Sequence, residues 1–205
     1  MGCNWREVAL GDLGKVVGGA TPSTRNPDYW NGDIAWLSPK DLTGYKKRYI
    51  ARGERSITRA GFNSCAAQLL PRGSVLFSSR APIGYVAIAA AELCTNQGFK
   101  SIVPNSRVDS LFLYYLLRYS TGRIESQGSG TTFKEVSGKT MRNIAVNIPE
   151  DLRVQKKIAA ILDAIDSKIE LNNQLNDYLA LLVDLEFAKR FDAETSITPL
   201  KNVLS

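Results

Sequence analysis

The last quarter of the chain repeats apolar side chains every three or four residues. Between Ile158 and Leu182 they follow the seven-residue spacing that is typical of helices packed against other helices. No Gly or Pro interrupts the chain between residue 152 and Pro199. This pattern predicts one amphipathic helix of roughly 38 residues, which is about 57 Å long at about 1.5 Å per residue.

A helix of this length carries more apolar surface than a small domain at one end can cover. We therefore expect it to pair with a second helix; a helix folded back along its own domain is the alternative. Asn172 falls inside the stripe, where a buried amide costs stability but fixes the alignment of paired helices. The alternative for Asn172 is a water-exposed position at the rim. The residues that we assign to the interface are Ile158, Ile161, Ile165, Ile169, Asn172, Leu175, Leu179 and Leu182.

The chain before this helix has a different sequence pattern, with short apolar runs separated by turn-forming residues. The run Gly73–Ser79 is followed by the turn "RAPIG" and by a second run, Gly84–Ala90, which predicts two neighbouring strands. The segment Ser110–Ser120 predicts a short apolar helix with Ser110 as its N-cap. Two further strand candidates are Gly98–Pro104 and Asn143–Pro149.

These patterns predict an α/β (α+β) globular domain over residues 1–150, a long helix over 151–192 and a tail over 193–205. With 205 residues, 44% of them hydrophobic, the chain can bury a core. Its three cysteines are widely spaced and form no disulfide framework, which favours a reducing compartment. The start "MGCNWR" lacks the apolar core of a signal peptide, and the longest apolar run is too short to span a bilayer. We therefore expect a cytoplasmic protein.

The net charge of +6 is concentrated in residues 1–150, which contain 19 Lys and Arg and 11 Asp and Glu. The helix region is net acidic. The densest basic run lies between residues 40 and 59, where Lys46, Lys47 and Arg48 are consecutive and tyrosines are interleaved. Such a run can face the phosphates of DNA. A solvated basic surface is the alternative.

The loop "GSGTTFKEVSG" is a second candidate for contact with a partner. Thr131, Thr132 and Lys134 offer hydrogen-bond donors among small residues that allow a close approach to a nucleic-acid backbone. A mobile surface turn is the alternative. The segment "GGATPST" at Gly18–Thr24 lacks the GxxxxGK[ST] spacing of a phosphate-binding loop, so it predicts only a turn.

The residue types present exclude several kinds of chemistry. The chain has no histidine, which excludes Ser-His-Asp and Cys-His catalysis and every histidine metal site. Asp28, Asp33 and Asp41 are loosely clustered acids that could hold Mg²⁺, but acids in turns are more often caps. We expect no catalytic residue, no metal and no cofactor. A scaffold that dimerises without binding DNA is a further alternative, and the basic globular part argues against it.

Six segments in a fixed order resemble one known family, the specificity subunits of Type I restriction–modification enzymes. The likeness runs over almost the whole chain, and the order of the segments makes it specific. The segments are "WREVALGDLGKVVGGATPST", "YWNGDIAWLSPKDL", "LFSSRAPIGYVAI", "TNQGFKSI", "GTTFKEVSGKTMRNIAVNIP" and "QKKIAAILDAIDSKIELNNQL".

The resemblance implies that the globular part is a target recognition domain that reads double-stranded DNA. It implies that the helix is a spacer that packs antiparallel against a second such helix and docks methyltransferase subunits. Methylation and cleavage in this family belong to the methyltransferase and restriction subunits, so this chain would be non-catalytic. For Arg80, a structural role in the turn "SSRAPIG" is the alternative to DNA contact. The expected DNA contacts are Arg25, Lys46, Lys47, Arg48, Arg80, Thr131, Thr132 and Lys134.

The chain departs from the family pattern because it holds one recognition domain and one helix, where full members hold two of each. The tail "ITPLKNVLS" loosely echoes "VALGDLGKV" and would be the start of a second recognition domain. The chain is therefore either a half-length subunit or a fragment of a longer one. In both cases two copies related by a two-fold axis could pair their helices, and the helix would set the gap between two DNA half-sites.

Overall fold

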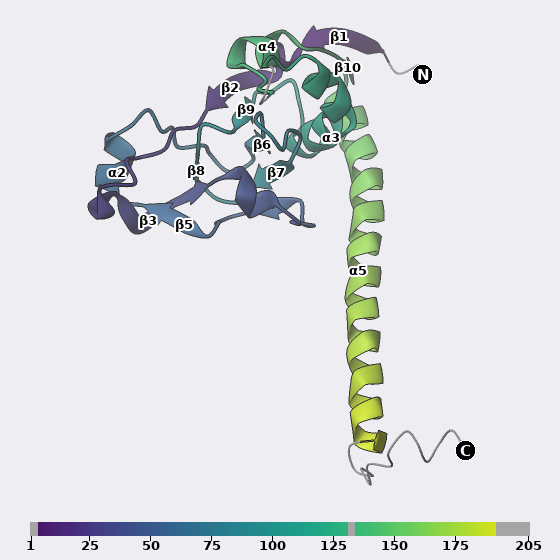
Figure 1. Ribbon diagram of the computed structural model, residues 1–205. Coiled ribbons are helices and arrows are strands. Elements are labelled where there is room, and N and C mark those ends of the chain that lie inside the picture. Colours follow the sequence, from purple (N-terminus) through teal and green to yellow (C-terminus); the bar gives the residue numbers. More distant parts are fainter. Residues whose placement is uncertain (1–3, 131–133, 192–205) are drawn as a thin grey trace. The chain divides into compact units, whose positions relative to one another are not determined.

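A computed structural model describes residues 4–130 and 134–191 of the chain (Figure 1). The chain divides into two compact units, Met1–Leu162 and Asp163–Ser205. We call the described part of the first the globular unit, and we call residues 163–191 the distal helix. The domain limits expected from the sequence stay predictions, and the tail over 193–205 lies outside the described residues.

Short strands make up most of the globular unit, and one long helix begins at its end. The elements in chain order are β1 (Trp5–Ala9), α1 (Leu10–Leu13), β2 (Gly14–Gly18), the 3-10 helix η1 (Pro27–Tyr29), β3 (Trp30–Leu37), the 3-10 helix η2 (Pro39–Leu42), β4 (Tyr49–Ile50), β5 (Arg55–Ile57), α2 (Arg59–Asn63), β6 (Val75–Phe77), β7 (Val86–Ala89), β8 (Cys94–Thr95), β9 (Lys100–Pro104), α3 (Ser110–Ser126), α4 (Gly138–Asn143), β10 (Ala145–Pro149) and α5 (Leu152–Phe191).

A five-stranded mixed sheet, in the order β2-β9-β6-β7-β4, forms the centre of the globular unit. The first four strands run antiparallel to their neighbours, and β4 joins β7 in parallel. Successive residues of β6 contribute to different cores: Val75 and Phe77 belong to one hydrophobic cluster, and Leu76 belongs to another. This alternation follows from the two-residue period of a strand that is buried on both faces. The four strands expected from the sequence are confirmed as β6, β7, β9 and β10.

Two smaller sheets lie at opposite ends of the globular unit (Figure 1). At one end β1 pairs antiparallel with β10, so the start of the described chain lies beside its last strand. At the other end β3 pairs antiparallel with β5 and in parallel with β8. The small sheet around β3 has its own core, which contains Trp30, Trp36 and Ile57.

The predicted apolar helix is confirmed as α3, and it packs its buried face on the core that contains β6 and β9. Its buried residues include Phe112, Leu113 and Leu117. The predicted N-cap, Ser110, is wrong by one residue. The Asp109 carboxylate accepts hydrogen bonds of 3.0 Å from the backbone N–H groups of Leu111 and Phe112, because an acceptor just before the first turn can reach donors that have no partner within the helix.

The first turns of α5 are fixed to the globular unit by a buried amide, that of Gln155. The Gln155 side chain is fully buried and makes three hydrogen bonds. Its Oε1 accepts from the backbone N–H of Asp109 at 3.0 Å, and its Nε2 donates to the carbonyl oxygens of Arg107 at 3.1 Å and Pro149 at 2.9 Å. Ile158, one turn further along, packs against the main core. One side chain thus joins the start of α5 to the chain before α3 and to the end of β10.

The long helix expected from the sequence is confirmed, with 40 residues in α5. Beyond Leu162 its leucine, isoleucine and valine side chains remain half-exposed or more in the isolated chain. Asn172 is exposed among them. No helix in the described part of the chain has both the length and the hydropathy required to cross a membrane.

We expect that Gln155→Leu lowers the free energy of unfolding by about 2–4 kcal/mol, because it leaves buried backbone donors and acceptors without partners. Urea unfolding at a fixed protein concentration measures this loss. The matched control is Gln174→Leu, which makes the same change at an exposed position of the same helix and should shift the free energy by less than about 0.5 kcal/mol. Equal losses in the two variants would contradict the anchoring role of Gln155.

Candidate nucleic-acid interface

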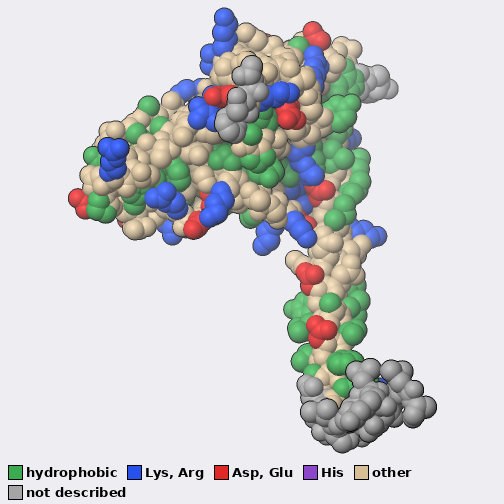
Figure 2. Space-filling model, viewed as in Figure 1, with side chains coloured by type: hydrophobic (Ala, Val, Ile, Leu, Met, Phe, Trp, Pro, Cys, Tyr) green, Lys and Arg blue, Asp and Glu red, His purple; other side chains and the backbone are tan. Residues whose placement is uncertain are grey.

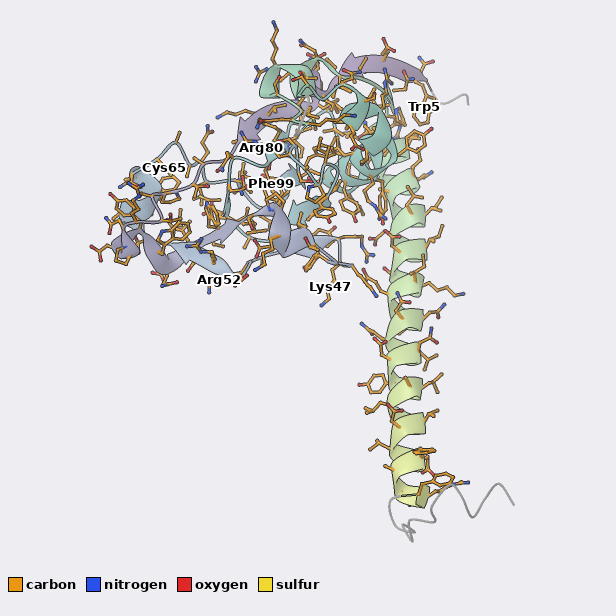
Figure 3. All side chains as sticks on the ribbon, viewed as in Figure 1. Trp5, Lys47, Arg52, Cys65, Arg80 and Phe99 are labelled. Atoms are coloured by element: carbon orange, nitrogen blue, oxygen red, sulfur yellow. The ribbon has the colours of Figure 1, made fainter. Side chains whose placement is uncertain are left out.

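The three consecutive basic residues expected at phosphates lie in the short loop between η2 and β4. Lys46 and Lys47 are exposed there, whereas Arg48 is half-buried. The Tyr45 hydroxyl donates a hydrogen bond of 2.6 Å to the carbonyl oxygen of Tyr49 and so closes the base of this loop. Figure 3 shows the Lys47 side chain extending from the edge of the globular unit. Both lysine ammonium groups are therefore accessible to a phosphate backbone.

The carboxylate of Asp41 holds the segment that follows this loop. Its Oδ2 accepts hydrogen bonds from the backbone N–H of Ser38 at 2.7 Å and from the Ser38 hydroxyl at 3.0 Å. Its Oδ1 accepts one of 2.7 Å from the backbone N–H of Glu54. A Cβ at Gly53 would lie 2.6 Å from Asp41 Oδ1, so the close approach requires glycine. Asp41, an acid that the sequence offered as a magnesium ligand, thus serves as a cap and as a tether for the start of β5.

Two other basic side chains of the run are held by neighbouring oxygens. Lys40 Nζ lies 3.0 Å from Glu54 Oε2 in an exposed ion pair. Arg52 Nη2 donates a hydrogen bond of 3.3 Å to the carbonyl oxygen of Asp33. Exposed pairs of this kind contribute little to stability, but they do fix where the side chains lie. Lys46 and Lys47 remain the accessible pair of this run.

The tryptophans of "YWNGDIAW" form an aromatic platform under Arg55. The Trp30 and Trp36 rings meet edge to face, with centroids 5.2 Å apart and planes at 89°. The guanidinium carbon of Arg55 lies 3.5 Å from the centroid of a Trp30 ring and 5.7 Å from that of Trp36. Strand register accounts for the Trp36 contact, because Trp36 of β3 is the direct partner of Arg55 in β5, whereas Trp30 is paired with Ile57 beyond an irregularity in β3.

The same two indoles hold the segment "GGATPST". Trp30 Nε1 donates to the carbonyl oxygen of Ser23 at 3.2 Å, and Trp36 Nε1 donates to that of Ala20 at 2.9 Å. This segment ends just before Arg25, an expected DNA contact, which is exposed. The indole N–H groups therefore fix the backbone that leads to Arg25.

Arg80, another expected DNA contact, forms part of a charged clamp around Glu135. Arg80 Nε lies 2.9 Å from Glu135 Oε2, and Lys100 Nζ lies 3.3 Å from Glu135 Oε1. Backbone bridges also join Glu135 to Arg80 and to Ser129. The clamp ties the loop between α3 and α4 to the turn after β6. This contact matches the structural alternative for Arg80, and its role at DNA stays a prediction.

The clamp shifts the ionisation of Glu135. Burial by itself raises the pKa of this carboxyl, but the hydrogen bonds and charges of Arg80 and Lys100 outweigh burial and hold the pKa below its ordinary value. The carboxylate therefore stays ionised at neutral pH and keeps its partners. Lys134, which precedes it, is exposed. The other two contacts expected in this loop, Thr131 and Thr132, lie outside the described residues.

The expected DNA contacts come from four separate segments: the turn ending at Arg25, the loop around Lys46, the turn after β6 that holds Arg80, and the loop between α3 and α4 that holds Lys134. Figure 2 shows Lys and Arg side chains spread over the visible face of the globular unit, without one dominant patch.

Arg55 was not singled out from the basic run by the sequence. The available signal was the tryptophan pair, since exposed arginines often stack on aromatic rings.

The expected helix interface has a mixed environment in the isolated chain. Ile158 packs partly on the globular core. The later members lie in water over about half of their surface or more; for example, Leu175 is 54% exposed and Leu182 is 55% exposed. This exposure is what a face that receives a partner would show, and pairing itself stays a prediction.

Comparison with known proteins assigns the chain to a protein family. Residues 3–181 match the family described as Type I restriction modification DNA specificity domain. The chain belongs to this family, which confirms the resemblance stated from the sequence. The matched residues include the three sheets of the globular unit and most of α5.

Individual relatives agree with this assignment. The Type I restriction enzyme MjaIX specificity subunit of Methanocaldococcus jannaschii is 41% identical over 201 residues, which cover 97% of this chain and 46% of that protein. The chain spans about half the length of the curated relatives it matches. The likeness therefore concerns one half of each of those proteins.

Solved structures share the fold. A chain from a study of complex assembly and conformational transition of the type I R-M system has a TM-score of 0.70 at 23% identity, covering 92% of this chain and 45% of that one. The HsdS subunit from Thermoanaerobacter tengcongensis has a TM-score of 0.64 at 21% identity, covering 85% of this chain and 40% of that one. The predicted mixed α and β fold with a long C-terminal helix is therefore confirmed.

We expect that Glu135→Gln lowers the free energy of unfolding at neutral pH by less than about 1 kcal/mol, because the clamp is partly exposed to solvent. The folded state lowers the pKa of Glu135, so its stabilising effect is complete above the ordinary value of 4.5 and is lost as the pH falls through the lowered pKa. Unfolding curves of the two proteins should therefore converge in acid. Glu92→Gln, at an exposed position, is the control; a difference at Glu135 that persists unchanged at low pH would contradict the clamp.

Proposed function

We propose that the chain is a DNA sequence-recognition subunit of a Type I restriction–modification complex. The observation that carries this proposal is the match of residues 3–181 to the DNA specificity family. The globular unit would bind one half of a split double-stranded target, with basic side chains at phosphates and polar side chains at base edges. The chain itself would be non-catalytic and would act in the cytoplasm, where methyltransferase and restriction subunits supply the chemistry.

The charge distribution supports a nucleic-acid partner. The basic excess lies in residues 1–150, and the described surface of that region exposes Arg25, Lys46, Lys47 and Lys134. Counterion release from DNA by such residues provides affinity without sequence preference. Sequence preference then requires a second set of contacts at the base edges.

The helix would supply assembly. A two-fold pair of α5 helices would cover the exposed leucines and isoleucines of both copies and would place two globular units at a fixed spacing. Methyltransferase subunits would dock on the paired helices. The same arrangement serves a half-length subunit that dimerises and a fragment that pairs with a second helix of its own longer chain.

Neutralising the exposed lysine pair tests DNA binding. We expect Lys46→Gln with Lys47→Gln to weaken binding about equally on target and random duplexes, because phosphates carry no sequence information. The slope of log affinity against log salt should shrink by about 0.9 for each lysine that no longer neutralises a phosphate. Fluorescence anisotropy at several salt concentrations measures both quantities.

The matched control for this test is a second consecutive exposed pair, Lys156 and Lys157 at the start of α5. Replacing both by Gln removes the same charge from the proposed spacer and should leave the slope unchanged. A wild-type chain that binds no duplex DNA at low salt would contradict the proposed function. A slope that is unchanged by the Lys46 and Lys47 substitutions would place that loop on a solvated face.

Charge placed inside the stripe tests assembly. We expect Leu175→Asp with Leu182→Asp to convert a dimer into monomers, because burying two unpaired carboxylates costs several kcal/mol. Analytical ultracentrifugation measures the association, and circular dichroism checks that the globular unit stays folded. Leu181→Asp, an exposed leucine beside the stripe, is the control and should remain dimeric. A double variant that still sediments as a dimer would show that the stripe is not the interface.

A further inference from the structure

The guanidinium of Arg55 is held in one orientation although its side chain is exposed to solvent. A distance of 3.5 Å from its carbon to the Trp30 ring centroid is van der Waals contact, which requires the plane of the guanidinium to lie against the ring face. Trp30 is only 8% exposed and Trp36 only 4%. Their hydrogen bonds to Ser23 and Ala20 keep the platform itself from rotating.

The backbone under Arg55 is fixed as well. The preceding residue, Glu54, donates its N–H to the Asp41 carboxylate, and Arg55 itself pairs with Trp36 across the β5–β3 ladder. Strand β5 is an edge of its three-stranded sheet, so its side chains are reached from outside. Both ends of the Arg55 side chain are therefore positioned before any partner arrives.

Among the described residues, the guanidinium of Arg55 forms no hydrogen bond and no ion pair, and its recorded side-chain contacts are those with the two tryptophan rings. The neighbouring cations differ in this respect, because Lys40 pairs with Glu54 and Arg52 bonds to the carbonyl of Asp33. If Arg55 served only to cover the indole, its aliphatic stem would suffice. An exposed planar group whose N–H donors have no partner among the described residues is instead suited to a ligand that offers two acceptors in one plane.

We propose that Arg55 is a specificity-determining residue that reads the O6 and N7 acceptors of one guanine in the DNA half-site. This inference rests on the proposed DNA-binding function and adds one base contact to it. A bidentate contact to guanine needs a planar fork of fixed direction, which the tryptophan platform supplies at little further loss of side-chain freedom. A phosphate contact has no such requirement, since a mobile lysine such as Lys47 satisfies it equally well.

The experiment uses the full chain and a duplex library with randomised half-sites. The wild type is used to select its preferred sequence, and affinities are then measured for that sequence, for each single base-pair replacement and for random DNA. The variants are Arg55→Lys, which keeps the charge, and Arg55→Met, which keeps an unbranched apolar stem over the indole. Arg72→Lys and Arg72→Met, at an exposed arginine outside the tryptophan cluster, are the matched controls.

Both Arg55 variants should lose discrimination at a single G·C pair by about 5- to 150-fold and keep the other preferences. Arg55→Lys should bind random DNA as the wild type does. Retained preference at every position would overturn the proposal, and so would an equal loss on target and random DNA, which indicates a phosphate contact. Unfolding of both variants, followed by thermal melting, would assign Arg55 to the tryptophan core alone and would also overturn it. A wild type that selects no sequence would overturn the proposed function itself and not only the role of Arg55.

Discussion

Apolar side chains that remain in water along the distal helix place the strongest constraint on this chain. Ile165 and Ile169 are each 52% exposed, and Leu179 is 50% exposed. Covering such groups contributes about 0.8 kcal/mol for each buried methylene, and leaving them bare favours aggregation. In the isolated chain the distal helix therefore exposes an apolar surface whose burial would be favourable, which is the physical basis of the assembly proposed above.

The extent of this apolar surface exceeds one seam. Leu171, Tyr178 and Leu185 form a further row at seven-residue spacing, and all three are more than half exposed. A pair of helices in contact buries mainly the two central rows of each. The remaining row agrees with the proposal that other subunits also dock on the helix. Asn172, exposed in the single chain, would then select among alignments of the pair, because only some of them give its amide a polar partner.

A long helix is useful as a spacer only if its first turns are firmly joined to the domain that it carries. Hydrophobic contact alone, such as that of Ile158 with the main core, tolerates sliding and rotation because it has no direction. The Gln155 amide adds direction, since its three hydrogen bonds are satisfied in one geometry only. The buried Gln155 amide thus both satisfies backbone groups that would otherwise lack partners and fixes the first turns of α5 against the core of the globular unit.

The sequence predicted the elements better than the contacts between them. Helix α5 was predictable because its apolar period continues from Ile158 to Leu182 and no Gly or Pro interrupts it. Strands β6 and β7 were predictable because a clear turn separates two apolar runs. Contacts between distant residues left no such local signal. Gln155 looked like one polar residue in a helical pattern, and the approach of Asp41 to Gly53 depends on a fold back of the chain that no periodicity encodes. The N-cap shifted from Ser110 to Asp109 because both residue types suit the position and only the local backbone decides between them.

The pieces of the candidate interface are held in place by a few polar groups that lie behind them. Asp41 fixes the start of β5, the two indole N–H groups fix the turn before Arg25, and Glu135 fixes the loop that carries Lys134. These anchors bond largely to backbone atoms, so they hold the course of the chain without prescribing the exposed side chains. Residues such as Lys46 or Lys134 can then change with little effect on the core, since surface substitutions away from such anchors usually shift stability by less than about 0.5 kcal/mol. Arg55 differs from these lysines, because its guanidinium lies on the buried tryptophan pair, so a change there affects the packing of the small sheet as well as any contact that the side chain makes.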